Sequence, residues 1–170
     1  MFKEISLDHL DINPFTVIKD DWFLITAGNK QAYNTMTAGW GAMGRCFNQD
    51  MFTVYVRKSR YTYEFLESNE FFTICFFDDI HHHGLDICGN LSGRSSNKVQ
   101  VAGFTPLFNE KAPYFDEARV VFVCKKVLTH DIEAKDFVNP SMDNEIYPDG
   151  DNRHTMFMGQ IVKVLINDEN

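Results

Sequence analysis

Short segments rich in β-branched and aromatic residues, each bounded by Gly, Asn or Asp, constrain the fold of this chain more than any other feature. Such side chains fit the pleated surface of a β-strand, and turn residues between the segments favour repeated strand reversal. In one segment Phe52, Val54 and Val56 occupy alternate positions, which predicts a strand with two differently used faces. We predict strands over residues 22–27, 52–56, 71–77, 119–127 and 156–166, as in a barrel or sandwich.

One short helix is predicted directly after the second of these strands. Tyr61, Phe65 and Leu66 fall on one helical face, and Ser59 precedes them as a candidate N-cap. This helix should end near residue 68 or 69.

A second helix is predicted from about Ser95 to residue 102, with Ser95 or Ser96 as its cap and Gly103 as its stop. Residues 83–88 are a further candidate. Strands and helices do not alternate, and the chain contains no Gly-x-Gly-x-x-Gly motif, so a doubly wound dinucleotide-binding fold is excluded.

Length and charge limit the classes of partner. The chain has 170 residues without a repeat or a Pro/Gly-rich linker, which suits one domain. Its net charge of −8 argues against non-specific nucleic-acid binding, which depends on cations that displace counterions. No apolar run is long enough for a signal peptide or a bilayer span, and the four cysteines occur singly. We expect a cytoplasmic protein with neither nucleic-acid nor membrane partners.

The densest positive cluster in this acidic chain comprises Arg57, Lys58 and Arg60. It lies between a predicted strand and a predicted helix, where unpaired N–H groups and the helix dipole favour a bound anion. Ser59 and Thr62 add hydroxyl groups. The alternative is a solvated turn whose cations only offset nearby acids.

Small and hydroxyl-bearing residues surround a single large ring at residues 34–41. Such residues let a backbone approach a flat heterocycle, and Trp40 would stack on it or wall the pocket. The 16 phenylalanines also favour either a β-rich core or a site for a flat aromatic ligand. The alternative for residues 34–41 is a strand and a turn with a buried Trp40.

A third segment, residues 88–94, has the chemistry of an anion site at a helix start. Ser92, the amide of Gly93 and Arg94 supply donors, and Lys98 follows one helical turn later. Because Ser-Gly turns are common, this segment alone does not distinguish an anion site from an ordinary turn.

Other reactive side chains have structural alternatives. Residues 81–83 are three consecutive histidines, but they lack ligand pairs at familiar metal-site spacings, and we predict a solvated loop rather than a metal site. Cys46 is either a thiolate favoured by Arg45 or a small apolar residue. His130 and His154 are candidates for proton transfer or for hydrogen bonds at strand edges.

Together these segments resemble the flavin reductase-like proteins of the FMN-binding split-barrel fold, in particular their flavoredoxin-like branch. The residues that carry the resemblance are Asn-Thr-Met-Thr-Ala-Gly-Trp-Gly at 34–41, Val-Arg-Lys-Ser-Arg-Tyr-Thr-Tyr-Glu-Phe at 56–65, Cys-Gly-Asn-Leu-Ser-Gly-Arg at 88–94, and His-Thr-Met-Phe-Met-Gly-Gln-Ile-Val at 154–162. The resemblance implies a mainly β, six-stranded Greek-key split barrel with short helices, formed as one domain over residues 1–170. It also implies a homodimer with one FMN per subunit near the dimer interface.

The resemblance also implies a set of cofactor-binding residues. Those along the isoalloxazine would be Asn34, Thr35, Met36, Thr37, Ala38 and Trp40. Those on the ribityl and phosphate side would be Arg57, Ser59, Arg60, Tyr61, Thr62, Cys88, Ser92, Gly93, Arg94 and Lys98. Family members often have Pro at position 58 and Asp at positions 95 and 97, so Lys58 would add charge at the phosphate, whereas Ser95 and Asn97 would loosen a helix cap.

The implied function is an FMN-dependent oxidoreductase that takes electrons from NADH, NADPH or another donor and passes them to free flavin or a small redox acceptor. Backbone N–H groups of residues 37–39 would stabilise charge on the reduced ring. No side chain is a firm catalytic residue, although His154 and Trp40 are candidates. Two alternatives stay open: an electron-relay or flavin-storage module without nicotinamide turnover, and a barrel that binds another ligand.

Overall fold

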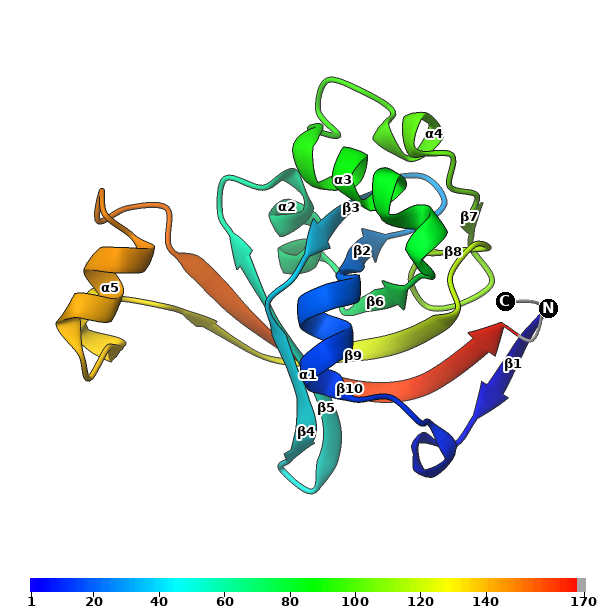
Figure 1. Cartoon of the computed structure of the whole chain (residues 1–170), viewed down its shortest axis with the longest axis horizontal. Coiled ribbons are helices and arrows are strands. Elements are labelled where there is room, and N and C mark those ends of the chain that lie inside the picture. Colours follow the sequence, from blue (N-terminus) through cyan, green and yellow to red (C-terminus); the bar gives the residue numbers. More distant parts are fainter. Residues whose placement is uncertain (168–170) are drawn as a thin grey trace.

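The structure is a computed structural model that describes residues 1–167, and one antiparallel sheet forms its centre (Figure 1). The strand order is β3-β2-β6-β9-β10-β5-β4, and β1 pairs with the end of β10. The strands of this sheet are β1 (Phe2–Ile5), β2 (Phe23–Gly28), β3 (Tyr33–Ala38), β4 (Gly41–Cys46), β5 (Gln49–Arg57), β6 (Phe71–Phe76), β9 (Val120–Asp131) and β10 (His154–Asn167). A separate ladder pairs β7 (Pro106–Leu107) with β8 (Tyr114–Phe115).

The five predicted strands correspond to β2, β5, β6, β9 and β10, but the predicted count of six is wrong. The main sheet has eight strands within the described residues. The difference arises because β10 is 14 residues long and pairs with three strands: β9 along its length, β5 through its first half and β1 through its end. β3 and β4 lie in the segment predicted from its small and hydroxyl-bearing residues, where the strand signal is weaker.

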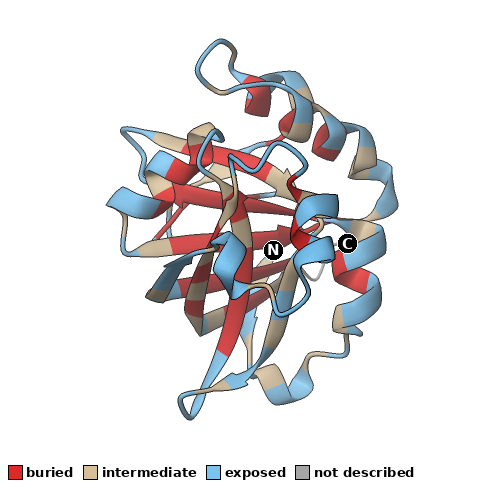
Figure 2. Ribbon diagram, turned by 90° about the vertical axis from the view of Figure 1, so that its left-hand side faces the viewer, coloured by how far each residue is buried: buried red, intermediate tan, exposed pale blue. Residues whose placement is uncertain are grey.

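Phenylalanine rings fill the space enclosed by the sheet, as Figure 2 shows by the buried positions along its strands. Phe52 packs against Phe23 and Phe122 with ring centroids 5.5 and 5.6 Å apart. A second cluster lies between the sheet and the helices that cover it, and includes Leu24, Leu85 and Val99. The aromatic residues of the sequence therefore serve chiefly as core.

Helices α2 (Tyr61–Ser68), α3 (His82–Asn90) and α4 (Lys98–Ala102) lie together on one side of the sheet (Figure 1). The other helices are α1 (Pro14–Thr16), which continues into the π-helical turn η2 (Val17–Asp21), and α5 (Pro140–Ile146). The 3₁₀ turns are η1 (Leu7–His9), η3 (Asp79–His81) and η4 (Ala134–Asp136). Within residues 1–167, none of the helices has the length and apolar character needed to cross a bilayer.

The predicted helices are present, and their predicted ends at residues 68–69 and at Gly103 are confirmed, but their predicted N-caps are wrong. Arg60, not Ser59, is the N-cap of α2, and it makes no side-chain capping bond. Asn97 caps α4 by accepting the N–H of Gln100, whereas the hydroxyls of Ser95 and Ser96 donate to the Ser92 carbonyl. A cap looser than that of an aspartate stays a prediction.

The chain between β9 and β10 forms a projecting arm, residues 132–153, that includes η4 and α5 and stands apart from the sheet in Figure 1. The Arg153 guanidinium holds the buried Asp143 carboxylate through two nitrogens, with Nη2 2.7 Å from Oδ2. Tyr147 is buried at the C-terminal end of α5. The arm thus has its own packing and polar contacts, and the sequence analysis did not predict it.

Candidate functional site

Three segments that are distant in the sequence meet beside β3. Asn34 Nδ2 donates to Thr62 Oγ1 of α2 at 2.7 Å, and Thr37 Oγ1 donates to the Leu85 carbonyl of α3 at 2.5 Å. Arg60 Nη1 donates to the Gly89 carbonyl at 2.9 Å. These bonds bring together the three segments that the sequence analysis singled out.

The loop after α3 approaches β3 so closely that only glycine fits. A Cβ atom on Gly93 would lie 2.0 Å from Asn34 Oδ1. Next to it, the Arg94 guanidinium lies 4.5 Å from the Tyr61 ring centroid and forms an ion pair with Glu64. The Arg94 charge is therefore partly balanced within the chain.

The start of α2 provides the least balanced positive charge of the site. Arg60 caps the helix without a side-chain bond, and the Tyr63 N–H donates to the Arg60 carbonyl at 3.0 Å, so the N–H groups of Tyr61 and Thr62 are the ones left for an external acceptor. Arg57 ends β5, and its guanidinium lies 5.4 Å from the Tyr147 ring centroid. The Ser59 N–H donates to Asn152 Oδ1 of the arm at 3.3 Å. This arrangement suits a phosphate-sized anion.

Six predicted site residues are buried beneath this surface: Asn34, Thr35, Met36, Thr62, Cys88 and Lys98. Thr35 is buried, with its Oγ1 2.8 Å from Thr26 Oγ1, and Met36 belongs to the core. The Lys98 ammonium is buried and donates to the Cys88 and Leu91 carbonyls at 3.0 and 3.1 Å. These bonds brace the loop, and the direct contact of these side chains with a ligand stays a prediction.

Burial governs the protonation of the Lys98 and Cys88 side chains. Desolvation lowers the pKa of Lys98, although nearby Cys88 opposes this effect. Desolvation raises the pKa of the Cys88 thiol to about 11. Cys88 is thus a protonated thiol at neutral pH and a poor nucleophile.

Trp40 and His154 form a second group beside the arm. Trp40 is 51% exposed, so the alternative of a buried tryptophan is wrong, and its ring lies 5.0 Å from the His154 imidazole. Burial, reinforced by Arg57 and Arg60, lowers the pKa of His154 to about 4. The imidazole is therefore neutral at physiological pH.

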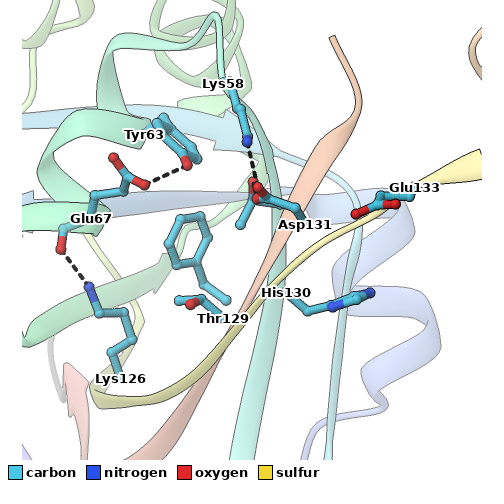
Figure 3. A pocket seen from close by; sticks show the side chains of 10 residues that line it. Lys58, Tyr63, Glu67, Lys126, Thr129, His130, Asp131 and Glu133 are labelled. Atoms are coloured by element: carbon cyan, nitrogen blue, oxygen red, sulfur yellow. Dashed lines mark hydrogen bonds and ion pairs between the residues drawn. The ribbon is translucent and has the colours of Figure 1, made fainter. Parts of the chain in front are cut away.

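A cavity of about 590 Å³ lies on another face, beside α2 and the ends of β9 and β10 (Figure 3). Lys58 Nζ bonds to Asp131 Oδ2 at 2.5 Å and Tyr63 OH to Glu67 Oε1 at 2.6 Å. Lys126 donates to backbone carbonyls of α2. The sequence analysis expected Lys58 to add charge at the phosphate site. In the structure Asp131 pairs with the Lys58 ammonium, so Lys58 adds no free charge there.

The remaining candidates have structural partners. His82 stacks on Trp22 with ring centroids 5.3 Å apart, and His130 Nε2 lies 3.0 Å from Asp136 Oδ2. In residues 1–167 no three His, Cys, Asp or Glu side chains group in a way that could hold a metal ion. Cys46 is a half-buried free thiol, and neighbouring Arg45 pairs with Asp50 rather than with sulfur.

Sequence reasoning missed Tyr147 and Asn152, which connect the arm to the site. Both lie in a segment without strand or helix periodicity. The only signal there was Asn139 followed by Pro140, a combination that favours a helix start.

We compared the sequence and the fold of the chain with those of known proteins. The chain matches the model of the flavin reductase like domain over residues 18–170. No curated protein sequence matches it.

Three solved structures illustrate the likeness in fold. An FMN-binding domain of a flavin reductase-like enzyme from Shewanella baltica gives a TM-score of 0.69 at 16% identity, covering 98% of this chain and 77% of the other. Flavoredoxin from Methanosarcina acetivorans gives a TM-score of 0.69 at 24% identity, covering 87% of this chain and 69% of the other. A Shewanella frigidimarina protein described with a split barrel domain gives 0.68 at 16% identity, covering 95% and 77%.

These relations define the class of the molecule as a mainly β split barrel of the flavin reductase type, which confirms the predicted fold class. The family model spans most of the chain. The chain belongs to the flavin reductase-like domain family.

Proposed function

We propose that this chain is a single-domain FMN-binding oxidoreductase. Electrons would pass from NADH, NADPH or another reduced donor, through bound FMN, to free flavin or a small redox acceptor. The observation that carries the proposal is the uncapped start of α2, flanked by Arg57 and Arg60, directly beside β3 in a chain of net charge −8.

The residues present fit the phosphate end of FMN. The first-turn N–H groups of α2, the Arg57 guanidinium and the Ser59 hydroxyl offer donors of the kind that hold phosphate. The close approach of Gly93 to Asn34 brings the 92–94 loop against β3, where it would follow the ribityl chain. A local basic site in an acidic protein favours a small anionic cofactor over a polyanion.

The residues also fit a flat ring system. β3 stands at the end of the strand order and pairs only with β2 in the main sheet, so the backbone groups on its other edge form no bonds to a neighbouring strand of that sheet. Thr37 and Ala38 at the end of β3 are partly exposed, as is Trp40 in the turn that follows, and their backbone could address the polar edge of a heterocycle. A shape-matched polar edge would set the orientation of the ring.

Bound FMN would supply the redox chemistry, taking up two electrons and giving them up again. The chain would position the ring and a nicotinamide within about 3–3.5 Å of each other and exclude water. N–H groups of residues 37–39 would stabilise the negative charge of the reduced ring. His154 is neutral at physiological pH, so its imidazole would add no positive charge beside the reduced ring.

The test is an absorbance spectrum of the purified protein after FMN addition, followed by anaerobic NADH and, separately, NADPH. A protein-bound band near 450 nm that bleaches at catalytic speed is expected. A band that persists with both nucleotides would point to electron relay or flavin storage, and the absence of bound FMN would overturn the proposal.

We also propose a homodimer in the cytoplasm. All four cysteines are free thiols, which fits a reducing compartment. Light scattering coupled to size-exclusion chromatography should give twice the monomer mass, and a monomer mass would contradict the dimer.

A further inference from the structure

A cavity of about 370 Å³ lies between the arm and the barrel, beside the proposed flavin site. Its walls come from η2, the turn between β3 and β4, strand β5, the arm and the first residue of β10. They are mainly apolar or aromatic, and consist of Ile18, Gly39, Trp40, Gly41, Tyr55, Ile132, Phe137, Ile146, Tyr147 and His154. This size and lining suit a small ring compound.

The Tyr147 hydroxyl lies against the ring of His154. Its oxygen is 2.7 Å from His154 Nδ1 and accepts the backbone N–H of His154 at 3.4 Å. When the hydroxyl donates its own proton to Nδ1, a neutral imidazole carries its hydrogen on Nε2. This tautomer would give His154 an N–H donor at the cavity.

Among the described residues that line this cavity there is no Asp, Glu, Lys or Arg. Arg57 and Arg153 lie outside the lining, with their guanidinium carbons 5.4 and 5.3 Å from the Tyr147 ring centroid, and Arg153 is bound to Asp143. His154 is neutral because burial and the positive charges of Arg57 and Arg60 lower its pKa. The lining therefore suits an uncharged ligand.

We propose that the cavity binds an uncharged, planar carbonyl compound such as a quinone, with its ring against Trp40 and its carbonyl oxygen accepting the Nε2–H of His154. Tyr147 is a positioning residue, since it acts through the imidazole. Binding stands on the arm geometry alone, whereas the assignment of this compound as the electron acceptor rests on the proposed function. As acceptor, the quinone would take two electrons and one proton from the anionic reduced flavin and a second proton from solvent, and would leave as the hydroquinone.

The test measures binding of duroquinone to the protein without FMN, by quenching of tryptophan fluorescence. Duroquinone is fully substituted and does not alkylate the free cysteines. Saturable quenching is expected, and it should persist in Trp22→Phe, which leaves Trp40 as the only tryptophan. Absence of saturable quenching would overturn the proposal.

Variants then test the role of each group. We expect His154→Leu to raise the duroquinone Kd at least tenfold and His154→Gln to stay within threefold, because the glutamine amide restores a donor. Tyr147→Phe should raise the Kd severalfold. Tyr63→Phe, which removes a bonded hydroxyl from the cavity of Figure 3, is the matched control and should bind as wild type.

Two further measurements separate the possible failures. Ile146→Trp would fill the cavity from α5 while His154 itself stays unsubstituted. This variant should abolish quenching by duroquinone in a protein with the wild-type melting temperature and circular dichroism. An FMN titration of His154→Leu should match wild type. Equal loss of FMN and duroquinone affinity would assign the cavity to the flavin and overturn the proposal, whereas failure to bind FMN in every variant would count against the proposed function alone.

Discussion

Arg57 and Arg60 face the same region although three positions separate them, because β5 ends at the first and α2 begins after the second. The intervening turn exposes the helix start, and neither Ser59 nor Lys58 closes it: Ser59 makes no capping bond, and Asp131 holds Lys58. At the residue scale, the candidate anion site thus depends on two side chains and on free backbone donors.

His154 should make stability depend on pH. Its pKa of about 4 in the folded protein lies below the ordinary value of 6.5. Between these pH values the unfolded chain takes up a proton that the folded protein does not, so stability present above pH 6.5 is lost as pH falls toward 4.

Thermal melts of wild type and His154→Gln from pH 7 to pH 4.5 check this prediction. The melting temperature of the variant should fall less steeply. His9→Gln, at an exposed position, should keep the wild-type slope, and parallel curves for all three proteins would contradict the account.

Asn97 should contribute measurably to α4, since it caps the helix by accepting the Gln100 N–H. Asn97→Ala is expected to lower the free energy of unfolding by about 1 kcal/mol. Ser95→Ala, at the position first considered as the cap, should change it by less than about 0.5 kcal/mol. Urea unfolding distinguishes the two, and equal losses would refute the cap assignment.

At the scale of elements, the register break in β10 at Met158/Gly159 lies against the tightest part of the core. A Cβ on Gly159 would lie 2.6 Å from Phe72 Cζ and 2.8 Å from Cys124 Cβ, both in buried residues. Gly159→Ala should therefore destabilise the protein by roughly 1–3 kcal/mol through overpacking.

Gly44→Ala provides the matched control, since a Cβ there meets nothing within 4 Å. It should leave the free energy of unfolding within about 0.5 kcal/mol of wild type. Chemical denaturation measures both variants. A Gly159→Ala protein as stable as Gly44→Ala would show that β10 is not packed as described.

The sequence predicted those elements whose signal is local. Five strands were found from β-branched and aromatic residues, and α2 from its apolar spacing. β3 was predicted only as the alternative interpretation of residues 34–41, a strand and a turn. β4 was not predicted because its Gly, Ala and Arg residues carry little strand signal, and the arm was missed because residues 132–153 have no periodicity. Long-range packing, rather than intrinsic preference, forms these elements.

The same distinction holds for the site. Segments 34–41, 57–62 and 88–94 were identified from local chemistry, and the bonds of Asn34 and Arg60 bring them together. Tyr147 and Asn152 could not be predicted, because their roles depend on how the arm folds back on residues 59 and 154. Buried positions such as Thr35 and Lys98 show that a motif contains both ligand-facing and supporting residues.

At the scale of the whole molecule, a split barrel of net charge −8 presents a local cationic site where β3, at one end of the strand order, meets the residues that follow β5, near the other end. The arm contacts this site through Tyr147 and Asn152, so the proposed cofactor site and the proposed ring cavity adjoin each other. This arrangement predicts that the phosphate and the ring of a flavin are recognised by separable groups.

Titration of the protein with FMN and with riboflavin, which lacks the phosphate, tests the central claim most directly. For Arg57→Ala and Arg60→Ala, the account predicts an FMN Kd raised about 10- to 100-fold, from the loss of about 1.5–3 kcal/mol of charge-assisted bonding, with riboflavin binding unchanged. Arg45→Ala, at the exposed β4–β5 turn, should bind both flavins as wild type does. Equal weakening of FMN and riboflavin, or unaltered FMN binding, would contradict a phosphate site at the start of α2.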